Sequence, residues 1–265
     1  TKETLCGGIQ TDMCRAVPAA PQGGNRMKGE NTMIRPPAAQ TNCMREVYFA
    51  AHYAQSCGDI SLIYGEAGLG KTFSLRQYAR ENNVIYIELR DCDKSTKGVC
   101  ERILEAIGKS RRGNDRALVN IIIDHLREHP KLIIIDEAQH LLLKAIENLR
   151  AINDATETGM VLCGNPTVYD QMHGRGQAHF AQLYSRIGIR RCIVSPEMED
   201  IQAIFAPYDL NGDCLRFLHS LGLQWGGIRN CIKIFNMAQE MAQKYGEPLS
   251  VGHLETAHDL RNGNQ

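Results

Sequence analysis

The sequence ISLIYGEAGLGKT, residues 60–72, joins an apolar run to a helical pattern through a glycine-rich loop. The run 60–64 predicts a buried strand, and residues 71–81 have the apolar spacing of a helix. The loop 65–72 fits the pattern G-x-x-x-x-G-K-[ST] in the strand–helix setting that this pattern requires. We therefore predict a phosphate-binding loop rather than a merely glycine-rich turn. Its backbone N–H groups would surround phosphate oxygens at a helix N-terminus.

Each residue of the loop has an expected role. Lys71 should reach the β- and γ-phosphates of a nucleotide, and Thr72 should hold Mg²⁺. Three glycines should let the backbone turn inward around the phosphates: Gly65, Gly68 and Gly70.

A second apolar run, residues 132–135, ends in the acidic pair Asp136 and Glu137. Ligands of parallel sheets gather at the carboxyl ends of the strands, so this pair should lie beside the phosphate-binding loop. Asp136 would then hold the metal, and Glu137 would polarise the attacking water. Alone, such a pair is usually a strand that meets solvent, and it is the loop that favours the functional interpretation.

Two further sets of residues leave alternatives open. Asn165 follows the run 161–164 and could hold the lytic water or contact the γ-phosphate; the less favoured alternative is a turn residue before Pro166. Arg186, Arg190 and Arg191 form a basic group near Ser185, and any of the three could act on a neighbouring subunit's nucleotide. The alternative is a solvated helix end.

The rest of the pattern predicts an α/β fold, in which a parallel sheet is covered by helices on both faces. Further short β-branched runs lie at 84–89, 131–136, 159–163 and 189–194, and helical patterns at 98–107, 114–128 and 141–155 separate them. After Pro196 only helices are expected, at 197–206, 213–221, 226–244 and 250–260. We predict a Gly/Pro-rich arm (1–41), a nucleotide-binding core (42–195) and a small helical subdomain (196–265).

Composition restricts the class of protein. The 265 residues include thirty Lys and Arg against thirty Asp and Glu, which argues against a uniformly basic nucleic-acid coat but leaves a local basic groove possible. The ten cysteines contain no CxxC pair, so we expect reduced thiols. No apolar run is long enough to span a bilayer, and nothing suggests export. We therefore expect a cytoplasmic protein that does not contact a membrane.

Taken together, these residues resemble an AAA+ ATPase with a helical lid. The runs TGMVLCGNPTVYDQMHG (158–174) and FAQLYSRIGIRR (180–191) are very similar to the phage Mu transposition protein B family, and the similarity extends from about residue 45 to about residue 257. The resemblance implies an ATP-dependent, sequence-nonspecific duplex-DNA-binding protein. Its relatives form filaments on target DNA, recruit and stimulate a DDE-type transposase, and leave on hydrolysis.

The resemblance also implies roles for single residues. Arg229, in the turn 226–229, matches the position that touches the γ-phosphate from the lid. Arg186 is our choice for the arginine that acts in trans. Two loops would line the DNA channel, through Lys94, Thr96, Lys97, Arg111 and Arg112, although both could also be ordinary solvated loops. The competing functions are a helicase-loader-like ATPase and a nucleotide-gated scaffold that does not bind DNA.

Overall fold

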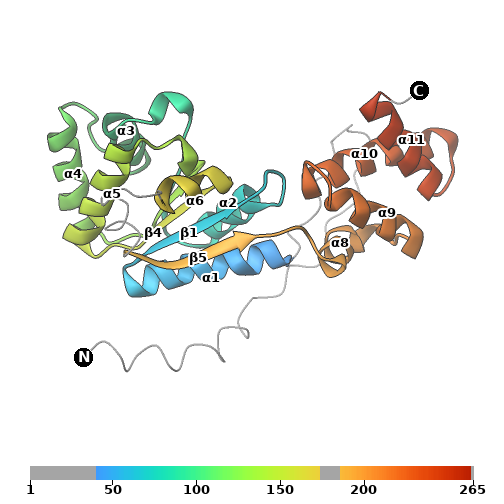
Figure 1. Cartoon of the computed structure of the whole chain (residues 1–265), viewed down its shortest axis with the longest axis horizontal. Coiled ribbons are helices and arrows are strands. Elements are labelled where there is room, and N and C mark those ends of the chain that lie inside the picture. Colours follow the sequence, from blue (N-terminus) through green and yellow to red (C-terminus); the bar gives the residue numbers. More distant parts are fainter. Residues whose placement is uncertain (1–39, 174–185, 264–265) are drawn as a thin grey trace, which may run out of the picture. The chain divides into compact units, whose positions relative to one another are not determined.

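The computed structural model describes residues 40–173 and 186–263. Five strands form one sheet in which every neighbouring pair is parallel, as expected, and their order is β2-β3-β4-β1-β5 (Figure 1). The strands are β1 (Ile60–Gly65), β2 (Ile85–Glu88), β3 (Ile133–Asp136), β4 (Met160–Gly164) and β5 (Ile187–Ile193). Each of the five β-branched runs therefore forms a strand, and the predicted fold class is confirmed.

Helices cover both faces of the sheet, and its central strands β3, β4 and β1 are apolar and buried along almost their whole length (Figure 1). On one face α1 (Asn42–Cys57) and α2 (Lys71–Glu81) pack around Val47, Ile63 and Leu75. On the other face α3 (Thr96–Ala106), α4 (Asp115–Glu128) and α5 (Leu143–Thr156) enclose a larger cluster of buried side chains.

Polar side chains fix where several helices begin. Ser95 accepts a hydrogen bond from the backbone N–H of Gly98, and Asn114 accepts one from that of Ala117. The first of these caps places the start of α3 two residues before the predicted start. A short helix that the sequence analysis missed, α6 (Pro166–His173), follows β4 and contacts β1.

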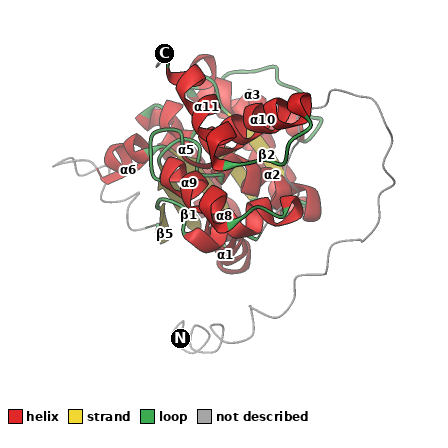
Figure 2. Cartoon of the chain, turned by 90° about the vertical axis from the view of Figure 1, so that its right-hand side faces the viewer, coloured by secondary structure: helices red, strands yellow, loops and turns green. Residues whose placement is uncertain are grey.

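Four helices follow the sheet, as predicted: α8 (Met198–Phe205), α9 (Gly212–Gly222), α10 (Gly227–Tyr245) and α11 (Val251–Asn262) (Figure 2). They bury a cluster of their own around Phe205, Leu218 and Phe235, and none of its buried members belongs to the two clusters of the sheet. The boundaries proposed at residues 41 and 195 stay predictions, and most of the arm lies outside the described residues.

Two further expectations concern thiols and membranes. The eight cysteines in the described ranges are free, and five of them are buried. None of the helices in residues 40–173 and 186–263 combines the length and the apolar character that a membrane span needs.

Candidate nucleotide site

The phosphate-binding loop connects the end of β1 to the first turn of α2. Lys71 opens α2 and is buried, and its Nζ donates hydrogen bonds to the carbonyls of Gly65 (2.7 Å) and Glu66 (2.8 Å). Gly70 occupies the N-cap position of α2. The ammonium group therefore lies against the backbone of the loop, directly beside the N-terminus of α2.

Gly68 lies where the loop meets the C-terminal helices. Its φ is +90°, and a Cβ atom there would lie 2.1 Å from the carbonyl oxygen of Gly226, so a larger residue would not fit. The Gly68 carbonyl accepts a hydrogen bond from the backbone N–H of Arg229 (3.1 Å). The structure thus brings Arg229 to the loop through its backbone, while its side chain is exposed.

Asp136 is the buried acid of the site, with 1% of its surface exposed at the carboxyl end of β3. Its Oδ2 accepts from the Tyr86 hydroxyl (3.2 Å), its Oδ1 accepts from the backbone N–H of Glu137 (2.9 Å), and the Thr72 side chain also hydrogen bonds to it. Burial raises the pKa of Asp136, and the hydrogen bonds from Thr72, Glu137 and Tyr86 act in the opposite direction.

These oxygen atoms suit a hard cation. The Thr72 hydroxyl and the Asp136 carboxylate are in contact, and Mg²⁺ in nucleotide sites is usually bound through one or two such groups together with phosphates and water. Among the described residues no group of three or more His, Cys, Asp or Glu side chains could hold a metal ion. The Thr72 hydroxyl and the Asp136 carboxylate therefore fit a cation that is bound together with a nucleotide.

The sequence analysis missed Tyr86 and the residues behind it. The Tyr86 hydroxyl oxygen accepts from Nε of Arg76 (3.3 Å), and Arg76 also forms an ion pair with Glu88. Tyr86 lies on β2, opposite Ile134 on β3, so its position relative to Asp136 depends on the pairing register. The signal in the sequence that could have indicated this contact was a tyrosine on a strand next to the acidic strand.

Glu137 and Asn165 come together through one amide side chain. Nε2 of Gln139 donates to Oε2 of Glu137 (2.5 Å), and Oε1 of Gln139 accepts from the backbone N–H of Asn165 (3.3 Å). The Asn165 side-chain oxygen accepts from the backbone N–H and the hydroxyl of Thr167 in the first turn of α6. The Asn165 side chain therefore holds the first turn of α6. Its role toward a nucleotide stays a prediction.

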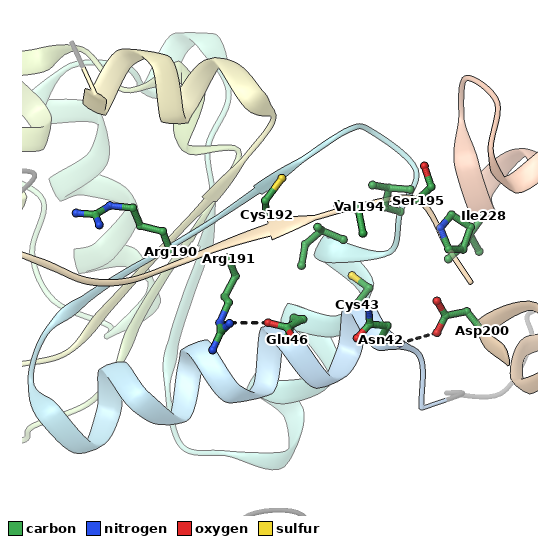
Figure 3. A pocket seen from close by; sticks show the side chains of 13 residues that line it. Asn42, Cys43, Glu46, Arg190, Arg191, Cys192, Val194, Ser195, Asp200 and Ile228 are labelled. Atoms are coloured by element: carbon green, nitrogen blue, oxygen red, sulfur yellow. Dashed lines mark hydrogen bonds and ion pairs between the residues drawn. The ribbon is translucent and has the colours of Figure 1, made fainter. Parts of the chain in front are cut away.

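A pocket of about 210 Å³ continues from the loop at Leu69 and is lined by the starts of α1 and α8 and the end of β5 (Figure 3). Asp200 closes one side: its carboxylate accepts from the backbone N–H of Asn42 (2.6 Å) and from that of Glu197 (3.0 Å). The buried Cys43 and the exposed Cys192 also line the pocket. Its place beside the phosphate-binding loop suits the base of a nucleotide.

The three candidate arginines have different surroundings. Arg186 pairs with Asp154 (3.3 Å), and 56% of its side chain is exposed. Arg191 pairs with Glu46 (3.2 Å) and lies over the Phe49 ring (4.5 Å), and both Arg190 and Arg191 line the pocket (Figure 3). Arg186 is therefore the one whose side chain is directed to the surface. Ser185 lies outside the described residues.

The basic residues proposed to meet DNA lie at the two ends of α3. Lys94 pairs with Asp91 (3.3 Å) and Lys97 with Glu101 (3.9 Å), whereas Arg111 pairs with Glu105 (3.3 Å). All three and Arg112 are exposed. Lys97 and Glu105, the partner of Arg111, are eight residues apart on α3, which is about 12 Å along the helix. The basic residues form two groups rather than one continuous cluster.

Thr96 is a correction to the sequence analysis. Only 3% of its surface is exposed, and its Oγ1 accepts a hydrogen bond from the Asn148 side chain (3.2 Å). The Ser95 cap places Thr96 in the first turn of α3, on the inner face with Val99 and Cys100. A hydroxyl buried in this way cannot reach a DNA phosphate.

Comparisons with known proteins agree with this architecture. Residues 55–172 match the AAA domain family, and residues 185–260 match the family "Mu B transposition protein, C terminal". The ATP-dependent target DNA activators B of Escherichia phages D108 and Mu are 28% identical over 226 residues, which cover 84% of this chain and 72% of each relative. A Mu-like prophage DNA transposition protein B of Haemophilus influenzae is 29% identical over 203 residues, 73% of this chain and 70% of that relative.

Solved structures show the same fold at low sequence identity. A chain of the Drosophila ORC complex bound to DNA superposes with a TM-score of 0.60 at 15% identity, over 92% of this chain and 70% of that one. Domain III of the Thermotoga maritima replication initiation protein DnaA gives a TM-score of 0.53 at 15% identity, over 83% of this chain and 92% of that one.

Proposed function

Because residues 55–172 form an AAA domain and residues 185–260 a Mu B C-terminal domain, we propose that this chain is an ATP-dependent DNA-binding ATPase of DNA transposition. The observation that carries the proposal is the contact between the Thr72 hydroxyl and the buried Asp136 carboxylate. It joins the phosphate-binding loop to the acidic strand end. The names of the relatives from phages D108 and Mu support the assignment to target DNA.

The arrangement suits hydrolysis of the γ-phosphate of ATP. Lys71 and the loop amides would bind the phosphates, and Thr72 and Asp136 would hold Mg²⁺, which would supply positive charge to stabilise the reacting phosphate. Glu137 would orient the attacking water and take its proton as the water oxygen bonds to phosphorus, while the bond to the bridging oxygen breaks and ADP leaves. Asn165 and Arg229 would contact the γ-phosphate side, and Arg186 would act on a neighbouring subunit's nucleotide.

DNA would meet the sheet-containing part of the chain. Lys94, Lys97, Arg111 and Arg112 are exposed, whereas residues 196–265 carry nine acidic against five basic side chains. Acidic surface repels phosphates, so the C-terminal helices are the poorer DNA surface.

A chain of zero net charge gains little DNA affinity as a single subunit, and repeated contacts along a filament would supply that affinity. We propose such filaments, formed with ATP on duplex DNA, and recruitment of a DDE-type transposase to them.

One experiment tests ATP, DNA and assembly together. The chain is incubated with ATP and duplex DNA, viewed by negative-stain microscopy, and its ATPase rate is compared with and without DNA. We expect filaments only when both are present, and a DNA-stimulated rate. Unassembled monomers with ATP and DNA would contradict the proposal. ATP binding without DNA binding would favour the scaffold function instead.

A further inference from the structure

Gln139 connects the ends of two neighbouring strands by a single side-chain amide. It lies in the short turn Ala138–His140 that follows β3. Its nitrogen donates to Glu137 at the end of β3, and its oxygen accepts from the backbone N–H of Asn165 at the end of β4. Both polar ends of the amide are therefore in use, and its orientation is fixed by two different strands.

The backbone around the amide is shaped to receive it. Glu137 has φ +57° and ψ +38°, a left-handed conformation that a residue with a side chain rarely adopts. A Cβ atom on Gly164 would lie 2.4 Å from Oε1 of Gln139, so a side chain at position 164 would displace the amide from this place. A strained glutamate and a glycine thus enclose the same amide.

The contact has a consequence for a general base. A carboxylate that receives an N–H at one oxygen is restricted in its rotation, and its other oxygen is left to face a water molecule. Because the same amide is held by the Asn165 backbone, a movement at the end of β4 would change the position of the Glu137 carboxylate.

We propose that Gln139 is a positioning residue for the hydrolytic reaction: its amide orients Glu137 and couples that carboxylate to the Asn165 segment. This inference rests on the proposed ATPase function. Gln139 acts through Glu137 and Asn165 and is not assigned any contact with ATP.

Two substitutions test the role. Gln139→Glu keeps an oxygen for the Asn165 N–H but removes the donor to Glu137, and Gln139→Met removes both hydrogen bonds at similar length. We expect kcat to fall roughly 10- to 100-fold in both, because a misoriented base loses much of its contribution. The KM for ATP and the affinity for a fluorescent ATP analogue should stay within about twofold, since the phosphate-binding loop is untouched.

Gln77 offers a matched control. Its Nε2 donates to Oε1 of Glu81 (2.6 Å), the same kind of amide–carboxylate contact on the surface of α2. Gln77→Glu and Gln77→Met should leave kcat unchanged. Unchanged kcat in both Gln139 variants, or a fall in affinity that accounts for the whole effect, would overturn the inference.

A spectroscopic measurement decides the contact independently of turnover. The side-chain ¹⁵NH₂ signals of Gln139 are assigned by their loss in Gln139→Met and followed after the substitution Glu137→Gln. We expect them to move while those of Gln77 do not; signals that stay in place overturn the inference. A wild-type chain that binds ATP without hydrolysing it would contradict the proposed function, and the NMR result would still decide whether Gln139 holds Glu137.

Discussion

The Tyr86 hydroxyl on β2 donates a hydrogen bond to Oδ2 of Asp136 at the end of β3, over 3.2 Å. The same hydroxyl accepts from Arg76 on α2, so three elements meet behind the acid that is proposed to hold the cation. A buried carboxylate depends on such donors, because each one compensates part of the hydration that burial removes.

Tyr86→Phe removes this donor without changing the ring. We expect the free energy of unfolding to fall by about 1–2 kcal/mol, since a hydrogen bond to a buried charge is lost. We also expect a higher Mg²⁺ concentration for half-maximal ATPase activity, because the Asp136 carboxylate is less well held. Urea unfolding and a Mg²⁺ titration measure the two effects. Tyr245→Phe, at an exposed tyrosine of α10, should change neither.

Lys71→Ala and Glu137→Gln should separate nucleotide binding from hydrolysis. Loss of the Lys71 ammonium removes phosphate binding, so both ATP affinity and filament assembly should be lost. Glu137→Gln keeps the shape of the side chain but cannot take a proton, so filaments should form and persist while the ATPase rate falls by at least about 100-fold. Equal loss of assembly in both variants would contradict the role given to Glu137.

Charge reversal at Lys94 and Arg111 should weaken DNA binding at both ends of α3. The slope of log affinity against log salt should become shallower by about one for each phosphate contact that is lost, while ATP affinity stays the same. Thr96→Val is the contrasting variant, because its buried hydroxyl bonds to Asn148. It should cost about 1 kcal/mol of stability and leave DNA affinity unchanged. An unchanged salt slope in the charge variants would show that other residues meet the DNA.

Cys43 and Cys192 should differ sharply in alkylation, although both line the pocket. Burial raises the pKa of the Cys43 thiol from its ordinary 9.0 to about 11, so at pH 8 only roughly one thiol in a thousand is ionised. Peptide mass spectrometry after iodoacetamide treatment at pH 8 should find Cys192 modified and Cys43 intact. ATP should protect Cys192 but not the exposed Cys57, because the base would occupy the pocket.

The raised pKa of Cys43 also determines how the free energy of unfolding changes with pH. The folded chain holds the thiol proton more tightly than the unfolded chain does, so the contribution to stability is complete below about pH 9 and is lost as the pH rises through about 11. Replacing Cys43 by Ala should therefore flatten the fall in stability between these two pH values.

The local pattern predicted much of this molecule. The run 60–64 and the loop after it were enough to place a strand, a phosphate-binding loop and the start of α2, because each of these depends on neighbouring residues alone. Thr96 was misplaced because the helix was expected to begin at Gly98. Counted from the Ser95 cap, Thr96 shares the helical spacing of Val99, Cys100 and Ile103, and it is buried with them.

Contacts between residues on different strands could not be predicted from the sequence. Tyr86 reaches Asp136 only because Ile85 pairs with Ile133, and a shift of one residue would turn Tyr86 to the opposite face. Gln139 lies two residues after the acidic pair, but the sequence does not show its contact with Asn165. That partner lies 26 residues away and is brought near by the parallel pairing of β3 with β4. α6 was missed because Asn165 was considered only as a nucleotide contact or as a turn residue before Pro166, whereas its side chain accepts hydrogen bonds in the first turn of a helix that begins at Pro166.

The separate cluster of buried side chains in the C-terminal helices bears on how this chain folds. Because the C-terminal helices bury Phe205, Leu218 and Phe235 among their own members, we expect them to hold part of their stability within this set. Such a unit can unfold while the sheet remains intact, so heating need not melt the chain in a single step. One melting temperature would then describe neither part, and amide hydrogen exchange would resolve two levels of protection, one for the sheet and one for the helices that follow it.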